Sequence, residues 1–175
     1  MLGLRIVMKS NDRITVIILG LLAQEPLSGY GLKKRMEVSV SNFVSPSFGN
    51  IYPTLKKLEA SGAIEEVPSE TPRKKRVYQT TKKGLQTLKA WLMSSIPEHE
   101  PFLLREYFFE FIDRKVRIKL VASYITHLQA RVKRYEAIKD AYQDVMGPFP
   151  YQTLRYGFSQ AKHDLAWYET LLKEL

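Results

Sequence analysis

Ser47-Phe-Gly-Asn-Ile-Tyr-Pro-Thr-Leu-Lys-Lys-Leu58 is the stretch that decides the fold of the first half of this 175-residue chain. Before it, Ser45 and Pro46 form the cap-then-proline pattern of a helix start, and Gly62 provides a stop, so we expect a helix that runs to Ser61. On a wheel of about 100° per residue, apolar residues separate from polar and small ones. The apolar side carries Phe48, Ile51, Leu55 and Leu58, and the opposite side carries Gly49, Asn50, Pro53, Lys56 and Lys57.

Pro53 lies inside this predicted helix. Proline removes an N–H there and costs about 3 kcal/mol in a helix interior, so its presence asks for a reason. A flat surface that a ligand approaches closely is one reason. The alternative is a helix that begins near Ile51, which makes Pro53 a first-turn residue.

Two helices are expected before this stretch. The first is capped by Ser10 or Asn11 and ends near residues 24–25, because its apolar residues recur with the period of about 3.6 residues and Pro26 follows. Ser28 opens a second, short helix in which Leu32 and Met36 share one face. The cations Lys33, Lys34 and Arg35 then point outward.

A basic hairpin is expected after the stretch. Two β-prone runs, 63–67 and 73–81, are joined by a proline-punctuated loop. Four consecutive cations at the tip repel one another in isolation, and contact with phosphates explains them. A solvated run of charge is the alternative. The four are Arg73, Lys74, Lys75 and Arg76.

Three helices followed by a basic hairpin form the pattern of a winged helix-turn-helix, whose third helix enters the major groove of DNA. The charge distribution agrees with this. Residues 1–90 hold 15 basic and 7 acidic side chains, whereas 91–175 hold 12 and 11, out of a net charge of +9. Nucleic acid is therefore the predicted partner of the first half, and a merely well-solvated domain is the alternative.

The second half is predicted to be helical. Residues 96–101 are the best domain boundary, no Gly or Pro occurs over 102–146, and 147–150 break the chain before a last helix from Tyr151. Apolar residues recur at spacings of three and four on both helices, as in coiled-coil contacts. A second subunit is expected to cover the apolar faces left over, with an intramolecular bundle as the alternative. The predicted dimer interface comprises Ile118, Val121, Ile125, Leu128, Leu154, Phe158, Leu165, Trp167, Tyr168 and Leu172.

Several classes of protein are disfavoured. The chain has no cysteine, and its three histidines lie far apart without metal-ligand spacing, so no metal and no cofactor are expected. No nucleophile or phosphate-loop motif occurs, which argues against an enzyme. The longest apolar run, 14–23, is about half of the roughly 20 residues that span a membrane. Residues 1–8 lack the features of a secretory signal, so a cytoplasmic location is expected and residues 1–9 form an arm or precede a start at Met8.

The motifs of the first half resemble those of the PadR family of transcriptional regulators. They are Ile18-Leu-Gly-Leu-Leu22, Ser28-Gly-Tyr-Gly-Leu32, the stretch 47–59, Gly62, and Arg76-Val-Tyr78 with Thr81 and Gly84. The likeness covers residues 14–95 strongly. It is weaker beyond, where Leu154-Arg-Tyr-Gly157 and Trp167 are similar to the longer-tailed, AphA-like members.

This resemblance implies a DNA-binding winged helix in the first half, and homodimerisation in the second half, often with an effector bound near the dimer junction. Two positions depart from the family pattern, because Thr80 replaces a usual aliphatic residue and Phe48 a usual polar one. Carried over by position, the recognition surface is Ser47, Asn50, Tyr52, Pro53 and Lys57, with Tyr30 and Lys33 flanking it and Lys74 to Arg76 in the wing.

Residue chemistry adds roles to these positions. An amide can form paired hydrogen bonds to adenine, so Asn50 is the best candidate for contact with a base edge. Lys56, Lys57 and the wing cations are expected to contact phosphates, which gives affinity without sequence information. Tyr52 is expected to bury its ring and offer its hydroxyl to a phosphate, or else to serve the core alone.

The sequence therefore predicts a mostly α-helical protein with a small β-hairpin: a winged helix-turn-helix domain over 1–96 and a helical dimerisation domain over 97–175. Its predicted function is a homodimeric, sequence-specific regulator of transcription, a repressor on a near-palindromic operator in double-stranded DNA. Release by a small-molecule effector is a further expectation. The alternative is a basic helical module that binds RNA or an acidic protein.

Overall fold

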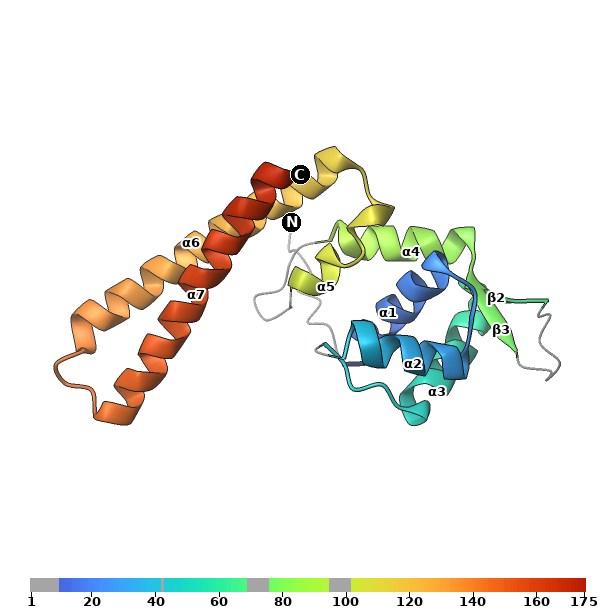
Figure 1. Cartoon of the computed structure of the whole chain (residues 1–175), viewed down its shortest axis with the longest axis horizontal. Coiled ribbons are helices and arrows are strands. Elements are labelled where there is room, and N and C mark those ends of the chain that lie inside the picture. Colours follow the sequence, from blue (N-terminus) through green and yellow to red (C-terminus); the bar gives the residue numbers. More distant parts are fainter. Residues whose placement is uncertain (1–9, 42, 69–75, 95–101) are drawn as a thin grey trace, which may run out of the picture. The chain divides into compact units, whose positions relative to one another are not determined.

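The computed structural model describes residues 10–41, 43–68, 76–94 and 102–175. The predicted arm at 1–9 and the wing-tip residues Arg73, Lys74 and Lys75 lie outside these ranges. The chain forms two compact units, Met1–Phe111 and Ile112–Leu175 (Figure 1). The predicted mostly helical class is confirmed.

The first unit is a winged helix. Three helices come first and a three-stranded antiparallel sheet of order β1-β3-β2 completes the motif. Ile64 pairs with Thr80 and Val67 with Val77, which is the expected hairpin, while Leu27 pairs with Tyr78 as a short third strand that the sequence did not indicate. The elements are α1 Ser10–Gln24, β1 Leu27–Ser28, α2 Gly29–Ser39, α3 Phe48–Ala60, β2 Ile64–Val67, β3 Val77–Thr80, α4 Lys82–Leu92, α5 Phe102–Glu106 and a 3-10 turn η1, Phe109–Phe111.

Helix α1 is the centre of this unit. It contacts α2, α3, α4 and β3. Apolar side chains on almost every side of the helix are buried: Ile14, Val16, Ile17, Ile18, Leu19, Leu21 and Leu22. The Thr80 hydroxyl donates a hydrogen bond of 2.7 Å to the Leu19 carbonyl. A threonine is therefore accommodated where the family pattern has an aliphatic residue, because its polar group is satisfied by α1.

Two glycines allow the close packing of this unit. Gly62 ends α3 with φ +70°, a left-handed conformation that glycine adopts without strain. Gly84 lies so near β2 that a Cβ there would stand 2.1 Å from the Ala63 carbonyl oxygen. The turn after α3 and the start of α4 thus depend on both residues.

The first unit extends past the predicted boundary at 96/97, and the helix expected to run unbroken from residue 102 is interrupted after Glu106. Phe102, Phe108 and Phe109 are buried, and the Phe108 ring lies where a Cβ on Gly20 of α1 would be, at 2.2 Å. These aromatic side chains pack on the winged helix, and burial of their rings outweighs the helix propensity of the segment.

Arg105 attaches α5 to α4. Its side chain is fully buried, and its Nη1 donates hydrogen bonds of 2.9 Å to the carbonyls of Trp91, Leu92 and Ser94. The guanidinium also lies 5.0 Å from the centre of the Trp91 ring. A cation at the C-terminal end of a helix satisfies carbonyls that have no helical donor and is favoured by the helix dipole.

The second unit is an antiparallel pair of helices, α6 Arg114–Tyr142 and α7 Pro148–Glu174 (Figure 1). Helix α7 starts earlier than the expected Tyr151, because Pro148 takes the first helical position, where its missing N–H is no loss. The Tyr124 and Tyr168 rings meet edge to face at 4.9 Å, and Arg131 forms an ion pair with Asp164. Burial raises the pKa of the Tyr124 phenol above its ordinary value.

The predicted dimer residues divide by exposure into three sets in this unit. Val121, Ile125, Leu128 and Tyr168 are buried within the helix pair itself, as the intramolecular alternative required. Trp167 stays 51% exposed. The others are half-buried: Ile118, Leu154, Phe158, Leu165 and Leu172.

We expect Arg105→Met to lower the free energy of unfolding by about 2–4 kcal/mol, because one buried and two partly buried carbonyls lose a charged donor. Urea unfolding followed by Trp91 fluorescence in a Trp167→Phe background measures this loss. The exposed Lys89→Met on α4 is the matched control and is expected to stay within about 0.5 kcal/mol. A loss for Arg105→Met no larger than for the control would contradict the role given to Arg105.

Candidate nucleic-acid interface

Helix α3 has two sharply different faces. Ile51, Thr54, Leu55 and Leu58 are buried against the unit. Three pairs of exposed residues recur every four positions, which is the spacing of one helix face. This exposed set, called here the α3 surface, consists of Phe48, Gly49, Tyr52, Pro53, Lys56 and Lys57.

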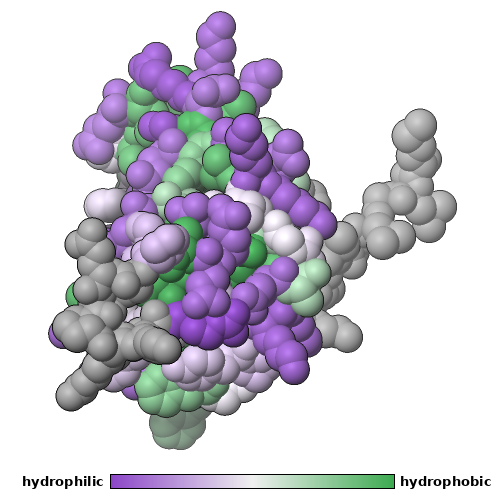
Figure 2. Space-filling view, turned by 90° about the vertical axis from the view of Figure 1, so that its right-hand side faces the viewer, coloured by the Kyte–Doolittle hydropathy of each residue, from purple (hydrophilic) through white to green (hydrophobic). Residues whose placement is uncertain are grey.

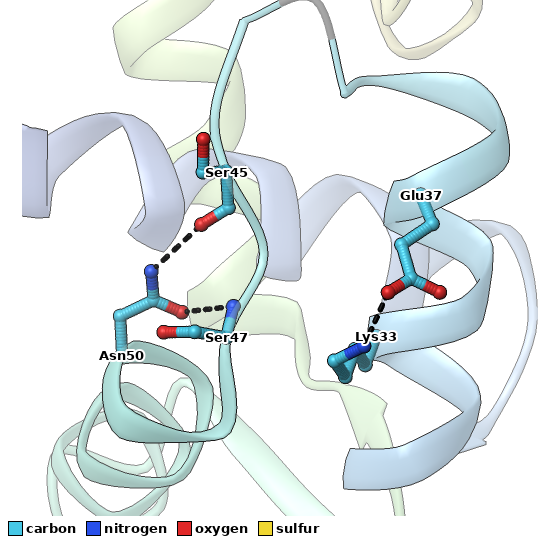
Figure 3. Close-up of polar contacts among 5 residues, drawn as sticks. All are labelled: Lys33, Glu37, Ser45, Ser47 and Asn50. Atoms are coloured by element: carbon cyan, nitrogen blue, oxygen red, sulfur yellow. Dashed lines mark hydrogen bonds and ion pairs between the residues drawn. The ribbon is translucent and has the colours of Figure 1, made fainter.

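The start of α3 differs from the prediction. The helix begins at Phe48 with Ser47 as its N-cap, and not at Ser45-Pro46. Asn50 explains the difference, because its Oδ1 accepts the Ser47 N–H at 3.0 Å and its Nδ2 donates to the Ser45 carbonyl at 3.0 Å (Figure 3). This is the reciprocal part of a capping box, and it fixes the first turn of the helix.

These two hydrogen bonds change the interpretation of Asn50. Its side-chain amide already holds the loop and the first turn of α3 together, so only its second N–H and second lone pair are left for a base edge. Pro53 lies inside the helix, which rules out the alternative of a start near Ile51. The missing Pro53 N–H removes the hydrogen bond that the Gly49 carbonyl accepts in an unbroken helix.

Phe48 was predicted on the packing face, and this was wrong. The residue is 44% exposed, because it is the first residue of α3 and lies almost one turn before Ile51, where the buried side of the helix begins. The ring lies 5.8 Å from the Tyr52 ring, and the Lys33 ammonium of α2 is 5.4 Å from its centre. An aromatic pair therefore stands at the N-terminal end of the α3 surface.

Tyr52 and the start of α2 are close neighbours. The Tyr52 ring is 52% exposed, more than the buried ring that was expected, and it lies where a Cβ on Gly29 would stand 2.8 Å from its Cε1 atom. Ser28 caps α2 by accepting the Gly31 N–H at 3.1 Å, and Tyr30 is exposed beside it. Lys33 forms an ion pair with Glu37 one turn further along α2 (Figure 3).

The cations of α3 and the wing differ in their ion pairing. Lys56 and Lys57 are exposed and, in the part of the chain that the structure describes, form no ion pair. Arg76, by contrast, pairs with Glu59 of α3 at 2.6 Å and Glu66 of β2 at 2.7 Å. Its guanidinium also lies 5.3 Å from the centre of the Tyr78 ring.

Arg76 thus joins the end of α3 to the root of the wing. The hydrogen bond to Glu66 and the nearby negative charge raise the pKa of the Arg76 guanidinium above its ordinary value. A phosphate would have to compete with two carboxylates for this side chain. Glu59 and Glu66 were not singled out in the sequence, since their positions on separate elements give no local signal.

The face of the molecule toward the wing carries mainly hydrophilic side chains with smaller apolar areas between them (Figure 2). Among residues 10–41, 43–68, 76–94 and 102–175, no group of three or more His, Asp or Glu side chains is placed to hold a metal ion. Within the same ranges, no helix is long and apolar enough to cross a membrane.

A winged helix with a polar, cationic third-helix surface defines a class of protein, the DNA-binding regulators of transcription. Residues 18–90 match the family described as Transcriptional regulator PadR-like family, and residues 99–175 match Virulence activator alpha C-term. The chain therefore carries the domain of the PadR-like family of transcriptional regulators over residues 18–90. It is therefore a DNA-binding protein and not an enzyme.

Individual relatives match the chain over most of its length. The chain is 29% identical over 169 residues to the Negative transcriptional regulator PadR of Bacillus subtilis, covering 89% of this chain and 93% of that protein. The solved structure of Bacillus subtilis PadR with operator DNA is 26% identical, with 92% and 98% of the two chains covered and a TM-score of 0.45. The solved structure of the same protein with p-coumaric acid is 27% identical, with 93% and 98% of the two chains covered and a TM-score of 0.44. The virulence activator AphA of Vibrio cholerae is 20% identical, with 92% and 96% covered and a TM-score of 0.41.

Loss of the Asn50 amide is expected to destabilise the protein. Asn50→Ala removes two hydrogen bonds at the start of α3 and is expected to lower the free energy of unfolding by about 1–2 kcal/mol. Urea denaturation measures it. Gln79→Ala is the matched control, because the Gln79 amide donates to Glu65 at 2.8 Å outside any helix cap. If Asn50→Ala is as stable as the parent protein, the Asn50 amide does not stabilise the start of α3.

Proposed function

We propose that the chain is a homodimeric repressor that binds a near-palindromic operator in double-stranded DNA through the α3 surface and the wing. The single observation that carries the proposal is the α3 surface, an exposed face of aromatic, small and cationic residues on a helix whose opposite face is buried. The relative described as a negative transcriptional regulator supports repression.

The α3 surface suits the major groove. Gly49 and Pro53 keep the helix face low, so that the backbone can approach base edges, and Ser47 and Asn50 lie at its N-terminal end, where recognition helices contact bases. Lys56 and Lys57, which are exposed and unpaired among the described residues, supply phosphate contacts. Tyr30 and Lys33 flank the surface from α2.

The wing is proposed to contact the neighbouring backbone. This part of the proposal rests on the positive charges of Arg73, Lys74 and Lys75, which attract phosphates. Arg76 anchors the wing root to α3 through Glu59 and Glu66, so it sets the spacing between the two DNA-contacting elements. A protein of this kind acts where operator DNA is found, which makes the cytoplasm its proposed location.

The dimer is proposed to form through the second unit. Since Val121, Ile125, Leu128 and Tyr168 are buried within one chain, the contact surface narrows to the half-buried residues of the predicted set and to Trp167. A tryptophan that is 51% exposed at such a spacing is typical of an anchor in a protein interface. Release of the operator by a small-molecule effector completes the proposal, as the family resemblance implies.

Salt dependence of DNA binding tests the proposal. An operator selected from a random duplex library and a shuffled copy are titrated by fluorescence anisotropy across a salt series. We expect tight binding to the operator, and Lys56→Ala, Lys57→Ala, Lys74→Ala and Lys75→Ala are each expected to reduce the salt slope by about 1 without changing sequence preference, because each removes one phosphate contact.

Lys133→Ala, an exposed cation of α6, is the matched control and is expected to leave the slope unchanged. Equal affinity for operator and shuffled DNA would contradict sequence-specific binding. Preference for duplex RNA, or binding that does not depend on salt, would favour the RNA or acidic-protein alternative.

The dimer has its own test. Trp167→Glu is expected to shift the protein from dimer to monomer in sedimentation equilibrium at micromolar concentration, because a charge is buried without a partner at the contact. Val145→Glu makes the same kind of change at a residue 79% exposed between α6 and α7, and is expected to leave the dimer intact. Dimers that persist in Trp167→Glu would exclude this face of α7 from the interface.

A further inference from the structure

Phe48 carries an aromatic ring without any polar atom on the α3 surface, unlike Tyr52, the other aromatic residue of that surface. It occupies the first helical position, and its ring is 44% exposed although the unit has a well-formed core beside it. The exposed part of the ring, beside Lys33 and Tyr52, is apolar surface that the core leaves uncovered and that a ligand can contact.

The ring is held in place before any ligand arrives. The Lys33 ammonium lies 5.4 Å from its centre, and Lys33 is itself held by its ion pair with Glu37 (Figure 3). The Tyr52 ring lies 5.8 Å away at an interplanar angle of 36°. Neighbours on two helices, α2 and α3, therefore restrict the ring, and a contact made by a restricted group loses less entropy on binding.

The chemistry of the ring selects one feature of the DNA. Phe48 has no hydrogen-bond donor or acceptor, so it gains nothing from phosphates or from the polar atoms of base edges. The major groove carries a single apolar feature, the C5 methyl group of thymine, and an apolar side chain is its partner. The N-terminal end of a recognition helix is the part that reaches base edges.

We propose that Phe48 is a specificity-determining residue that reads a thymine methyl group in each operator half-site. The inference rests on the proposed function, because it requires α3 to enter the major groove. Removal of one buried methyl group costs about 0.8 kcal/mol, so the expected loss of affinity is about 4-fold per half-site.

The test removes methyl groups one at a time. In the operator selected from the random duplex library, each thymine is replaced in turn by deoxyuridine, which lacks only the C5 methyl, and affinity is measured by anisotropy. The parent protein is expected to lose about 4-fold in affinity when either thymine of one symmetric pair is replaced, whereas Phe48→Ala binds the thymine and uracil forms of those positions equally. Phe48→Leu, which keeps an apolar contact, is expected to retain part of the discrimination.

Controls separate this result from loss of structure. Phe48→Ala must keep the cooperative unfolding of the parent protein, and Val38→Ala, at a residue of α2 that is 80% exposed and outside the α3 surface, must keep discrimination at the same thymine. No uracil effect in the parent, or equal uracil effects in the parent and in Phe48→Ala, would overturn the inference while leaving the proposed function intact. Equal binding of operator and shuffled DNA would overturn both.

Discussion

Burial of α1 on nearly all sides is the constraint on which the first unit depends. Ile17, Ile18, Leu19 and Leu21 have no exposed surface, so α3, α4 and β3 must each present an apolar face to this one helix. The hydrophobic effect is not directional, but each neighbour of a helix that is covered on all sides must turn its apolar face toward that helix. The outer face of α3 is exposed as a consequence, because Ile51, Leu55 and Leu58 turn inward.

Polar contacts then set what hydrophobic burial leaves undetermined. Packing fixes which face of α3 looks outward, but it does not fix where the helix begins or how the wing stands beside it. The Asn50 amide decides the first, and Arg76 with Glu59 and Glu66 decides the second. Each exposed ion pair is worth little free energy by itself, so these contacts act by geometry rather than by strength.

The second unit shows the same division between apolar and polar contacts. Val121, Ile125 and Leu128 of α6 are covered by α7, and the Arg131–Asp164 ion pair and the contact of Tyr124 with Tyr168 define how the helices are aligned. Because one apolar stripe is consumed within the chain, fewer residues remain for a partner than the sequence pattern indicated. Trp167 stands out among them because it lies beside the stripe and stays exposed.

The amino-acid sequence by itself determined the order of elements, the basic hairpin, the two-faced third helix and the membership of a DNA-binding family, because these follow from local periodicity, turn residues and motifs. Only the tertiary structure decided the rest. The later start of α3, which leaves Phe48 at its exposed end, follows from the hydrogen bonds of Asn50 to Ser45 and Ser47, whose geometry the residue pattern did not reveal. The third strand at Leu27, the break after Glu106 and the pairing of Arg76 depend on residues distant along the chain. The role of Arg105 could not be predicted from the sequence for the same reason. Its partners are backbone carbonyls at the end of α4, and the pattern of side chains does not show which carbonyls lack a donor.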